Sequence, residues 1–224
     1  MQPEIVLYGN TPVTSPYVMT VFVALEEKGL PYRLELLDLA RGEQHHPEFV
    51  AGSITNRVPT LHLREGQRDT WLSESVAIVE YLEERFAAPA HARLYPENLE
   101  ERARVRLVQG LVRSDFMPIR EERSTDTLFY GAPTQPLSER AEAARVRLVR
   151  IAAALLSAGQ PYVASAFSIA DVDLATLLQR LAHNGDPIPS RLADYADSVW
   201  ARPSIQKWLL LTTYRARQRA PLSA

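Results

Sequence analysis

The chain has 224 residues, of which 46% are hydrophobic and 23% are charged. This composition is ordinary for a folded globular protein, and the length allows one large domain or two modest ones. The formal net charge is −2, with basic and acidic residues in nearly equal number, so we expect no nucleic-acid partner and no anionic membrane partner. No apolar run is long enough to span a bilayer and no secretory signal pattern opens the sequence, so we expect a cytoplasmic protein.

Cysteine is absent and histidine is sparse. Without cysteine, the chain forms no disulfide and supplies no thiol nucleophile of its own. None of the five histidines stands in an H-x-x-x-H or H-E-x-x-H pattern, so the sequence predicts no metal site. We interpret the adjacent pair His45 and His46 as part of a surface loop. Because the chain has no cysteine, a ligand must supply the thiol in any thiol chemistry.

The first part of the chain alternates between strand and helix patterns. Residues 4–8 form a short β-type run that a Gly-Asn-Thr-Pro segment ends. Between Pro16 and Lys28 apolar residues recur at helical spacing, which predicts an amphipathic helix, and residues 32–37 predict a second strand. A strand, a helix and a strand in this order predict a right-handed βαβ unit with parallel strands.

Two shorter strands and a helix complete this block. Residues 60–63 and 69–72 flank a Glu-Gly turn and predict an antiparallel hairpin. A helix is expected from Glu74 to Phe86, because its apolar residues fall on one face. Residues 87–97 contain two prolines and no periodicity, which is typical of a linker between domains.

The rest of the chain predicts helices alone. Helical patterns separated by loops rich in proline and glycine indicate an all-helical second domain. The expected helices are 98–116, 138–158, 169–183, 190–201 and 204–214. The predicted domains are therefore 1–86 and 98–224, joined by the linker 87–97.

Four local sequences make this order of elements more specific. Ser15-Pro16-Tyr17 precedes the first helix, and Asn56-Arg57-Val58-Pro59-Thr60-Leu61 leads into the hairpin. Leu72-Ser73-Glu74-Ser75 opens the helix after the hairpin, and Ser168-Ile169-Ala170-Asp171 opens a helix of the second domain as a capping box. With these motifs the chain resembles the cytosolic glutathione transferases. That resemblance implies an α/β thioredoxin-like N-terminal domain (βαβαββα) followed by an all-α helical bundle.

Ser15 is the candidate catalytic residue. In the Ser-using members that the chain resembles, a hydroxyl at this place supports the glutathione thiolate, and the positive end of a helix favours an anion. Ser followed by Pro is also an ordinary helix start, so the dipeptide is equally explained by capping. Thr11 and Thr14 are the alternative hydroxyl donors.

The resemblance also implies residues that bind glutathione. The Val58 backbone, before a cis proline, would pair with the cysteinyl part of glutathione as an added strand does at a sheet edge. Glu74 and Ser75 would hold the γ-glutamyl end, where a helix N-terminus attracts the carboxylate. The alternative is that they only cap the helix, a role that we expect for Ser73. Arg57 is a candidate partner of the glycyl carboxylate, or a solvated surface residue.

These residues together predict a glutathione transferase. Its first task is to favour the thiolate, because a free thiol with a pKa of about 8.5 is only slightly ionised at pH 7. Glutathione would be the co-substrate, small electrophiles or peroxides the second substrate, and the assembly a homodimer. The stretch from Arg113 to Arg123 is similar to the bacterial YfcF-like branch, which implies glutathione-dependent peroxidase or disulfide-reductase activity. Isomerase or dehalogenase chemistry stays open, as does a non-catalytic glutathione-transferase-like binding or regulatory protein.

Overall fold

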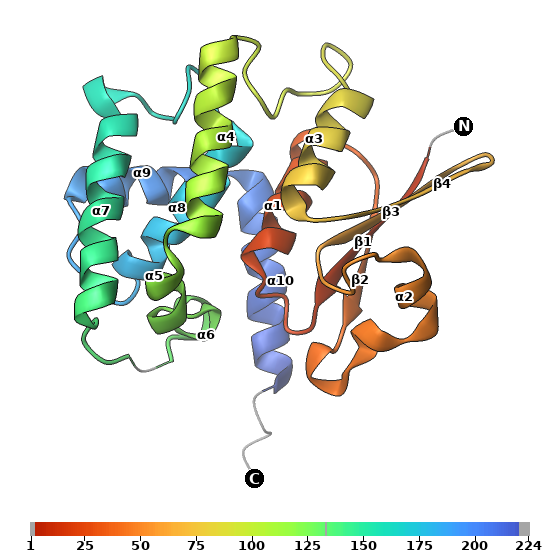
Figure 1. Cartoon of the computed structure of the whole chain (residues 1–224), viewed down its shortest axis with the longest axis horizontal. Helices are drawn as coiled ribbons and strands as arrows, with labels where there is room; N and C mark the ends of the chain where they lie inside the picture. The colour runs from red at the N-terminus through yellow and green to blue at the C-terminus, as the bar shows by residue number, and fades with distance from the viewer. Residues whose placement is uncertain (1–2, 133, 220–224) are drawn as a thin grey trace. The chain divides into compact units, whose positions relative to one another are not determined.

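The computed structural model describes residues 3–132 and 134–219, and these form two compact units. One unit contains the chain up to Arg93 together with the chain from Lys207, and the other is Leu94–Gln206. Every strand in the described residues belongs to the first unit, whereas the second unit is built from helices (Figure 1). The predicted architecture, an α/β domain and an all-helical domain, is confirmed.

A four-stranded sheet forms the centre of the first unit, with the order β2-β1-β3-β4. The strands are β1 (Glu4–Asn10), β2 (Arg33–Leu37), β3 (Thr60–Glu65) and β4 (Arg68–Ser73). β1 pairs in parallel with β2, as the βαβ pattern predicts. β3 pairs antiparallel with β1 and forms the predicted hairpin with β4.

Helices cover both faces of this sheet. The face that carries the fully buried Leu7, Leu61 and Leu63 packs against α1 (Pro16–Glu27) and α3 (Ser75–Arg85). On the other face lies the short helix α2 (Pro47–Gly52), which follows the 3₁₀ turns Leu39–Arg41 and Glu43–His45. The resemblance implied a helix here, but six residues with a single buried side chain give too weak a period to place it from sequence.

The first helix, α1, is buried on nearly every side. All eight residues from Val18 to Leu25 are buried, so the helix is not amphipathic as predicted. The reason is α10 (Pro203–Arg219), which runs beside α1 (Figure 1) and places the Trp208 ring 5.3 Å from that of Phe22. The last helix of the chain therefore completes the core of the first unit.

A buried lysine orders the segment after α3. Lys28 Nζ donates to the carbonyls of Phe86 and Ala92, each at 2.9 Å, and pairs with Glu83 at 2.7 Å. Its side chain is fully buried, and its three N–H donors therefore meet three acceptors. Residues 87–98 contain no helix or strand, but these bonds fasten the segment as far as Ala92 to the ends of α1 and α3.

The second unit contains more helices than the sequence predicted. They are α4 (Leu99–Ser114), α5 (Met117–Glu122), α6 (Thr125–Tyr130), α7 (Glu139–Leu155), α8 (Ile169–Ala182) and α9 (Ser190–Trp200). The four long helices lie where they were expected, whereas α5 and α6 were missed because six residues are too few to show a period. No helix in the described ranges is long and apolar enough to cross a bilayer.

The predicted capping box at the start of α8 is confirmed. The Asp171 carboxylate is fully buried and accepts hydrogen bonds from Ser168 N–H, Ser168 Oγ and Val163 N–H, all at 2.8–2.9 Å. Tyr195 donates a fourth bond at 2.8 Å. Burial and the Asp171 carboxylate raise the pKa of Tyr195 well above its usual value, so its proton stays in place as a donor.

Candidate functional site

Three loops that carry the predicted site residues leave the sheet at the same end. Thr60, the first residue of β3, pairs with Tyr8 on one side and with Ser73 on the other. The residues just beyond these positions therefore lie close together: the turn that leads to Ser15, the Val58 bend and the start of α3. The structure thus gathers Ser15, Val58, Arg57, Glu74 and Ser75 at one end of the first unit.

Ser15 is the N-cap of α1, and Pro16 is the first helical residue. Ser15 Oγ accepts from the N–H of Val18 at 3.4 Å, and the residue is half-buried. Within residues 3–132 and 134–219, the hydroxyl proton of Ser15 has no acceptor. The side chain therefore caps the helix as an acceptor while it keeps a proton to donate to a ligand atom.

The turn before Ser15 depends on Asn10, which sequence reasoning treated only as part of a strand-ending segment. Its side chain bonds to Pro12, Thr14 and the backbone of Ser15. Thr14 Oγ1, one of the alternative hydroxyls, is buried and donates to the Pro12 carbonyl at 3.2 Å. Asparagine is typical of such side-chain-to-backbone bonds in turns, and this preference was the available signal for Asn10.

Val58 lies in the bend before β3, and the Val58-Pro59 peptide bond is cis, as the resemblance implies. Among the residues that the structure describes, neither the N–H nor the carbonyl of Val58 has a hydrogen-bond partner. Because Val58 lies two residues before the start of β3, these two groups can pair with an extended peptide.

Glu74 has an unusual backbone for a non-glycine residue, with φ 74° and ψ 119°. It occupies the N-cap of α3, makes no side-chain capping bond and is exposed, so its carboxylate is open to a ligand. Ser75 follows as the first residue of the helix and is only 3% exposed. A strained backbone retained at such a place is typical of functional sites.

The prediction that Ser73 caps α3 is wrong. β4 continues through Ser73, so Glu74 takes the cap position instead. The Ser73 hydroxyl lies 3.2 Å from Thr60 Oγ1 and 3.3 Å from Ser53 Oγ, and these two oxygens are 2.9 Å apart. This cluster of hydroxyls ties the Val58 bend to the start of α3, because Thr60 Oγ1 also donates to the carbonyl of Arg57 at 2.8 Å.

Arg57 is held by its backbone and exposed at its side chain. Its N–H donates to Thr55 Oγ1 at 3.3 Å. The guanidinium has no ion pair in the part of the chain that the structure describes. The structure therefore places a cation beside Val58, and its role as a carboxylate partner stays a prediction.

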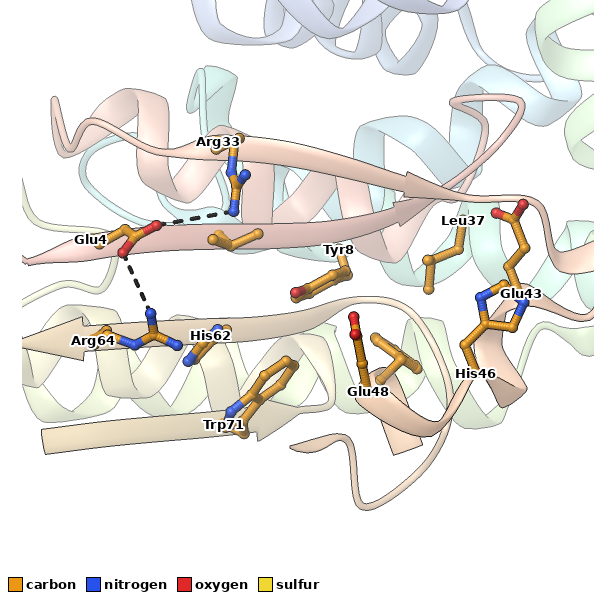
Figure 2. Close-up of a pocket in the computed structure, with 12 residues that line it drawn as sticks. Glu4, Tyr8, Arg33, Leu37, Glu43, His46, Glu48, His62, Arg64 and Trp71 are labelled. Carbon is orange, nitrogen blue, oxygen red and sulfur yellow. Dashed lines mark ion pairs between the residues drawn. The ribbon is translucent and has the colours of Figure 1, made fainter. Parts of the chain in front are cut away.

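A separate hollow of about 320 Å³ lies on the α2 face of the sheet (Figure 2). Three of its charged side chains form ion pairs: Glu4 lies 4.0 Å from Arg33 and 3.9 Å from Arg64. Tyr8 and His62 both stack on the Trp71 ring. His46 also lines this hollow. The pairing of Glu4 with Arg33 and Arg64 favours a structural role for these three residues.

No cluster of three or more His, Asp or Glu side chains in the described residues could hold a metal ion.

Comparison with known sequences matches most of the chain to one family. Residues 14–85 match the profile of the glutathione S-transferase N-terminal domain, and residues 98–214 match that of the C-terminal domain. The chain belongs to the glutathione S-transferase family.

Two solved structures of this family cover nearly the whole chain. A glutathione transferase homologue from Burkholderia gl BGR1, with bound glutathione, is 36% identical over 94% of this chain and 98% of that chain, with a TM-score of 0.74. A maleylacetoacetate isomerase from Anaeromyxobacter dehalogenans 2CP-1, with bound glutathione in its active site, is 27% identical over 92% of this chain and 95% of that chain, with a TM-score of 0.68.

Curated relatives match over shorter stretches. The maleylacetoacetate isomerase of Pseudomonas aeruginosa is 39% identical over 115 residues, which are 50% of each chain. Glutathione S-transferase theta-3 of Mus musculus is 36% identical over 85 residues, 38% of this chain and 33% of the relative. The chain spans about half the length, or less, of the curated relatives that it matches.

Proposed function

We propose that the chain binds glutathione and uses Ser15 to stabilise its thiolate for attack on a small electrophile. The observation that carries the proposal is the N-cap geometry of Ser15, whose oxygen accepts from the helix while its proton is free. A thiolate beside this hydroxyl accepts a charge-assisted hydrogen bond and meets the positive end of α1. Both effects favour the charged form and lower the pKa of the bound thiol.

The rest of the tripeptide fits the neighbouring groups. An extended glutathione peptide pairs with the free N–H and carbonyl of Val58. Its γ-glutamyl end then meets the start of α3, where Glu74 receives the ammonium group and Ser75 lies beside the carboxylate. The Arg57 guanidinium takes the glycyl carboxylate. Glutathione bound to relatives with this fold supports the assignment.

Three kinds of reaction suit such a thiolate. In conjugation, sulfur bonds to an electrophilic carbon and a leaving group departs; in isomerisation, sulfur adds to a double bond and leaves again after rotation. In peroxide reduction, sulfur attacks a peroxide oxygen, the O–O bond breaks and an alcohol leaves, and a second glutathione converts the resulting sulfenic acid to the disulfide and water. The similarity of Arg113–Arg123 to the YfcF-like branch favours the peroxidase reaction. The relatives named as maleylacetoacetate isomerases favour isomerisation as a second candidate.

An activity screen with glutathione tests the proposal. Chlorodinitrobenzene, cumene hydroperoxide, a small disulfide and maleylacetoacetate test conjugation, peroxide reduction, disulfide reduction and isomerisation in turn, and Ser15→Ala is the control for each. We expect turnover with at least one of these substrates. We also expect the melting temperature to rise with glutathione concentration, because binding at a hundredfold excess over Kd adds about 2.7 kcal/mol to the free energy of unfolding. Binding without turnover would favour a non-catalytic protein, and no binding at millimolar glutathione would refute both. Light scattering tests the expected homodimer.

A further inference from the structure

One carboxamide holds the turn between β1 and α1. Asn10 Nδ2 donates to the Pro12 carbonyl at 2.7 Å and to Thr14 Oγ1 at 3.1 Å, and Oδ1 accepts from the Ser15 N–H at 3.1 Å. The orientation of the amide follows from its partners, because a carbonyl can only accept and a backbone N–H can only donate. Both donors and one lone pair of Asn10 are thereby engaged within this turn.

The turn is anchored at two further points. Asn10 pairs with Leu37 in the β1–β2 ladder, and the next N–H, that of Thr11, donates to the Leu37 carbonyl at 2.8 Å. In the middle of the turn, the Val13 carbonyl accepts from Thr212 Oγ1 of α10 at 2.7 Å. Since both anchors lie before Thr14, the bonds of Asn10 connect them to Ser15.

These bonds also determine which hydroxyl is free to donate. Thr14 Oγ1 accepts from Asn10 and donates to Pro12, and the residue is 4% exposed. Ser15 Oγ receives a bond from Val18 but gives none to any described residue. The Thr14 hydroxyl therefore donates its proton within the turn, whereas the Ser15 hydroxyl can donate its proton to a ligand.

We propose that Asn10 is a positioning residue for thiolate activation. By binding Thr14 and the N–H of Ser15, it leaves the Ser15 hydroxyl as the donor that faces the glutathione sulfur. Asn10 acts through Ser15 and does not touch the thiol itself. This inference rests on the proposed function of Ser15.

A double-mutant cycle on the glutathione complex tests this role, with thiolate absorbance followed against pH. Asn10→Ala should raise the pKa of the bound thiol by about one unit and lower kcat with chlorodinitrobenzene near neutral pH by up to about tenfold. The KM for glutathione should change by less than about twofold, because the binding groups are untouched. In a Ser15→Ala background, Asn10→Ala should shift the thiol pKa no further.

Two other variants serve as controls. Thr14→Val removes the hydroxyl that accepts one of the Asn10 bonds but leaves the bond to the Ser15 N–H, and we expect it to raise the bound-thiol pKa by less than Ser15→Ala does. If circular dichroism shows that Asn10→Ala does not fold, Asn10→Thr replaces it, because threonine suits a strand end and lacks the carboxamide.

Each adverse outcome has its own meaning. An unchanged thiol pKa in Ser15→Ala would refute the proposed function and this inference together. A raised pKa in Ser15→Ala but not in Asn10→Ala would refute the positioning role alone. The positioning role would also be refuted if Asn10→Ala raised the thiol pKa by the same amount in the Ser15→Ala background as in the parent protein. A Thr14→Val shift as large as that of Ser15→Ala would make Thr14 the donor and also refute the inference.

Discussion

Two non-glycine residues in the described chain have a positive φ, Asn56 at 52° and Glu74 at 74°. Such a backbone costs about 1–3 kcal/mol, and it persists where the surrounding structure requires it. Asn56 lies just before the Val58 bend and Glu74 opens α3. Both conformations therefore lie in the loops that we propose to hold glutathione.

Substitutions at Glu74 separate the strain from the charge. Glu74→Ala and Glu74→Gly both remove the carboxylate, so both should raise the KM for glutathione by about tenfold or more, from the loss of about 1.5–3 kcal/mol. Only Glu74→Gly relaxes the backbone, and it should be more stable than Glu74→Ala by about 1 kcal/mol in urea unfolding.

Asn56→Gly is the matched control for Glu74, because it also relaxes a positive φ but removes no carboxylate. Its KM for glutathione should stay near that of the parent protein. Equal KM values for glutathione in all three variants and the parent would show that the Glu74 carboxylate makes no contact with the tripeptide.

Motifs located the predicted site residues but not their supports. Ser15, Val58 and Glu74 stand in short patterns whose types and order are visible in the sequence, and the fold brings their loops to one end of the sheet. Asn10 and Thr212 contribute through side-chain hydrogen bonds that depend on the path of the backbone. Thr212 is also distant from the turn in sequence, so no local pattern could indicate its bond to Val13.

At the scale of elements, the length of a helix decides whether the sequence pattern locates it. Long periodic segments such as α4, α7 and α8 were placed to within a few residues, whereas the six-residue helices α2, α5 and α6 were not. For α1 the apolar period predicted the helix correctly but only one buried face, whereas the structure buries nearly every side of it. The additional burial comes from α10, whose Trp208 contacts Phe22 although the two residues lie near opposite ends of the chain. Tertiary packing of this kind leaves no trace in a local pattern.

Lys28 offers a test of how the ends of α1 and α3 are joined. Lys28→Met removes the ion pair with Glu83 and leaves the Phe86 and Ala92 carbonyls without the lysine donor, so unfolding free energy should fall by about 3–5 kcal/mol. Lys207→Met breaks the pair of an exposed lysine with Glu26 and should cost less than about 1 kcal/mol. Urea unfolding of the two variants makes the comparison, and equal losses would contradict a structural role for Lys28.

Glu122 joins the end of α5 to the start of α7. Its carboxylate accepts from Ser138 Oγ at 2.5 Å and from Ser138 N–H at 2.8 Å, and these bonds lower the pKa of Glu122. Because the pKa is lower in the folded state, the stabilisation is complete above the unfolded pKa of about 4.3 and is lost as the pH falls through the folded value.

Replacing Glu122 should therefore lower the free energy of unfolding least at low pH. The stability difference between the parent protein and Glu122→Gln should shrink as the pH is lowered from about 7 to about 3. Glu121→Gln is the control, because Glu121 is exposed and has no hydrogen bond or ion pair in the described chain. A difference for Glu122→Gln that stays constant with pH, measured by urea unfolding, would show that the Ser138 bonds do not favour the charged carboxylate.

At the scale of the whole molecule, the first unit is built from two separate parts of the chain. The segment from Lys207 supplies Trp208, which is fully buried beside Phe22 of α1. The second unit has its own buried tryptophan, Trp200, which packs against His183 and Phe129. The two tryptophans lie eight positions apart in sequence and belong to different units.

This division predicts that each tryptophan protects the backbone amides of its own unit from hydrogen exchange. Replacing a buried tryptophan with alanine leaves a cavity and costs about 3–5 kcal/mol, and its first effect is on the unit that contains the cavity. In hydrogen exchange, Trp208→Ala should speed exchange in α1 and the β-sheet, although these elements lie far from Trp208 in sequence. Trp200→Ala should instead speed exchange in α8 and α9. Faster exchange confined to Leu94–Gln206 in Trp208→Ala would show that the last helix stabilises the second unit instead. Equal increases throughout both units would show that the chain unfolds as one body.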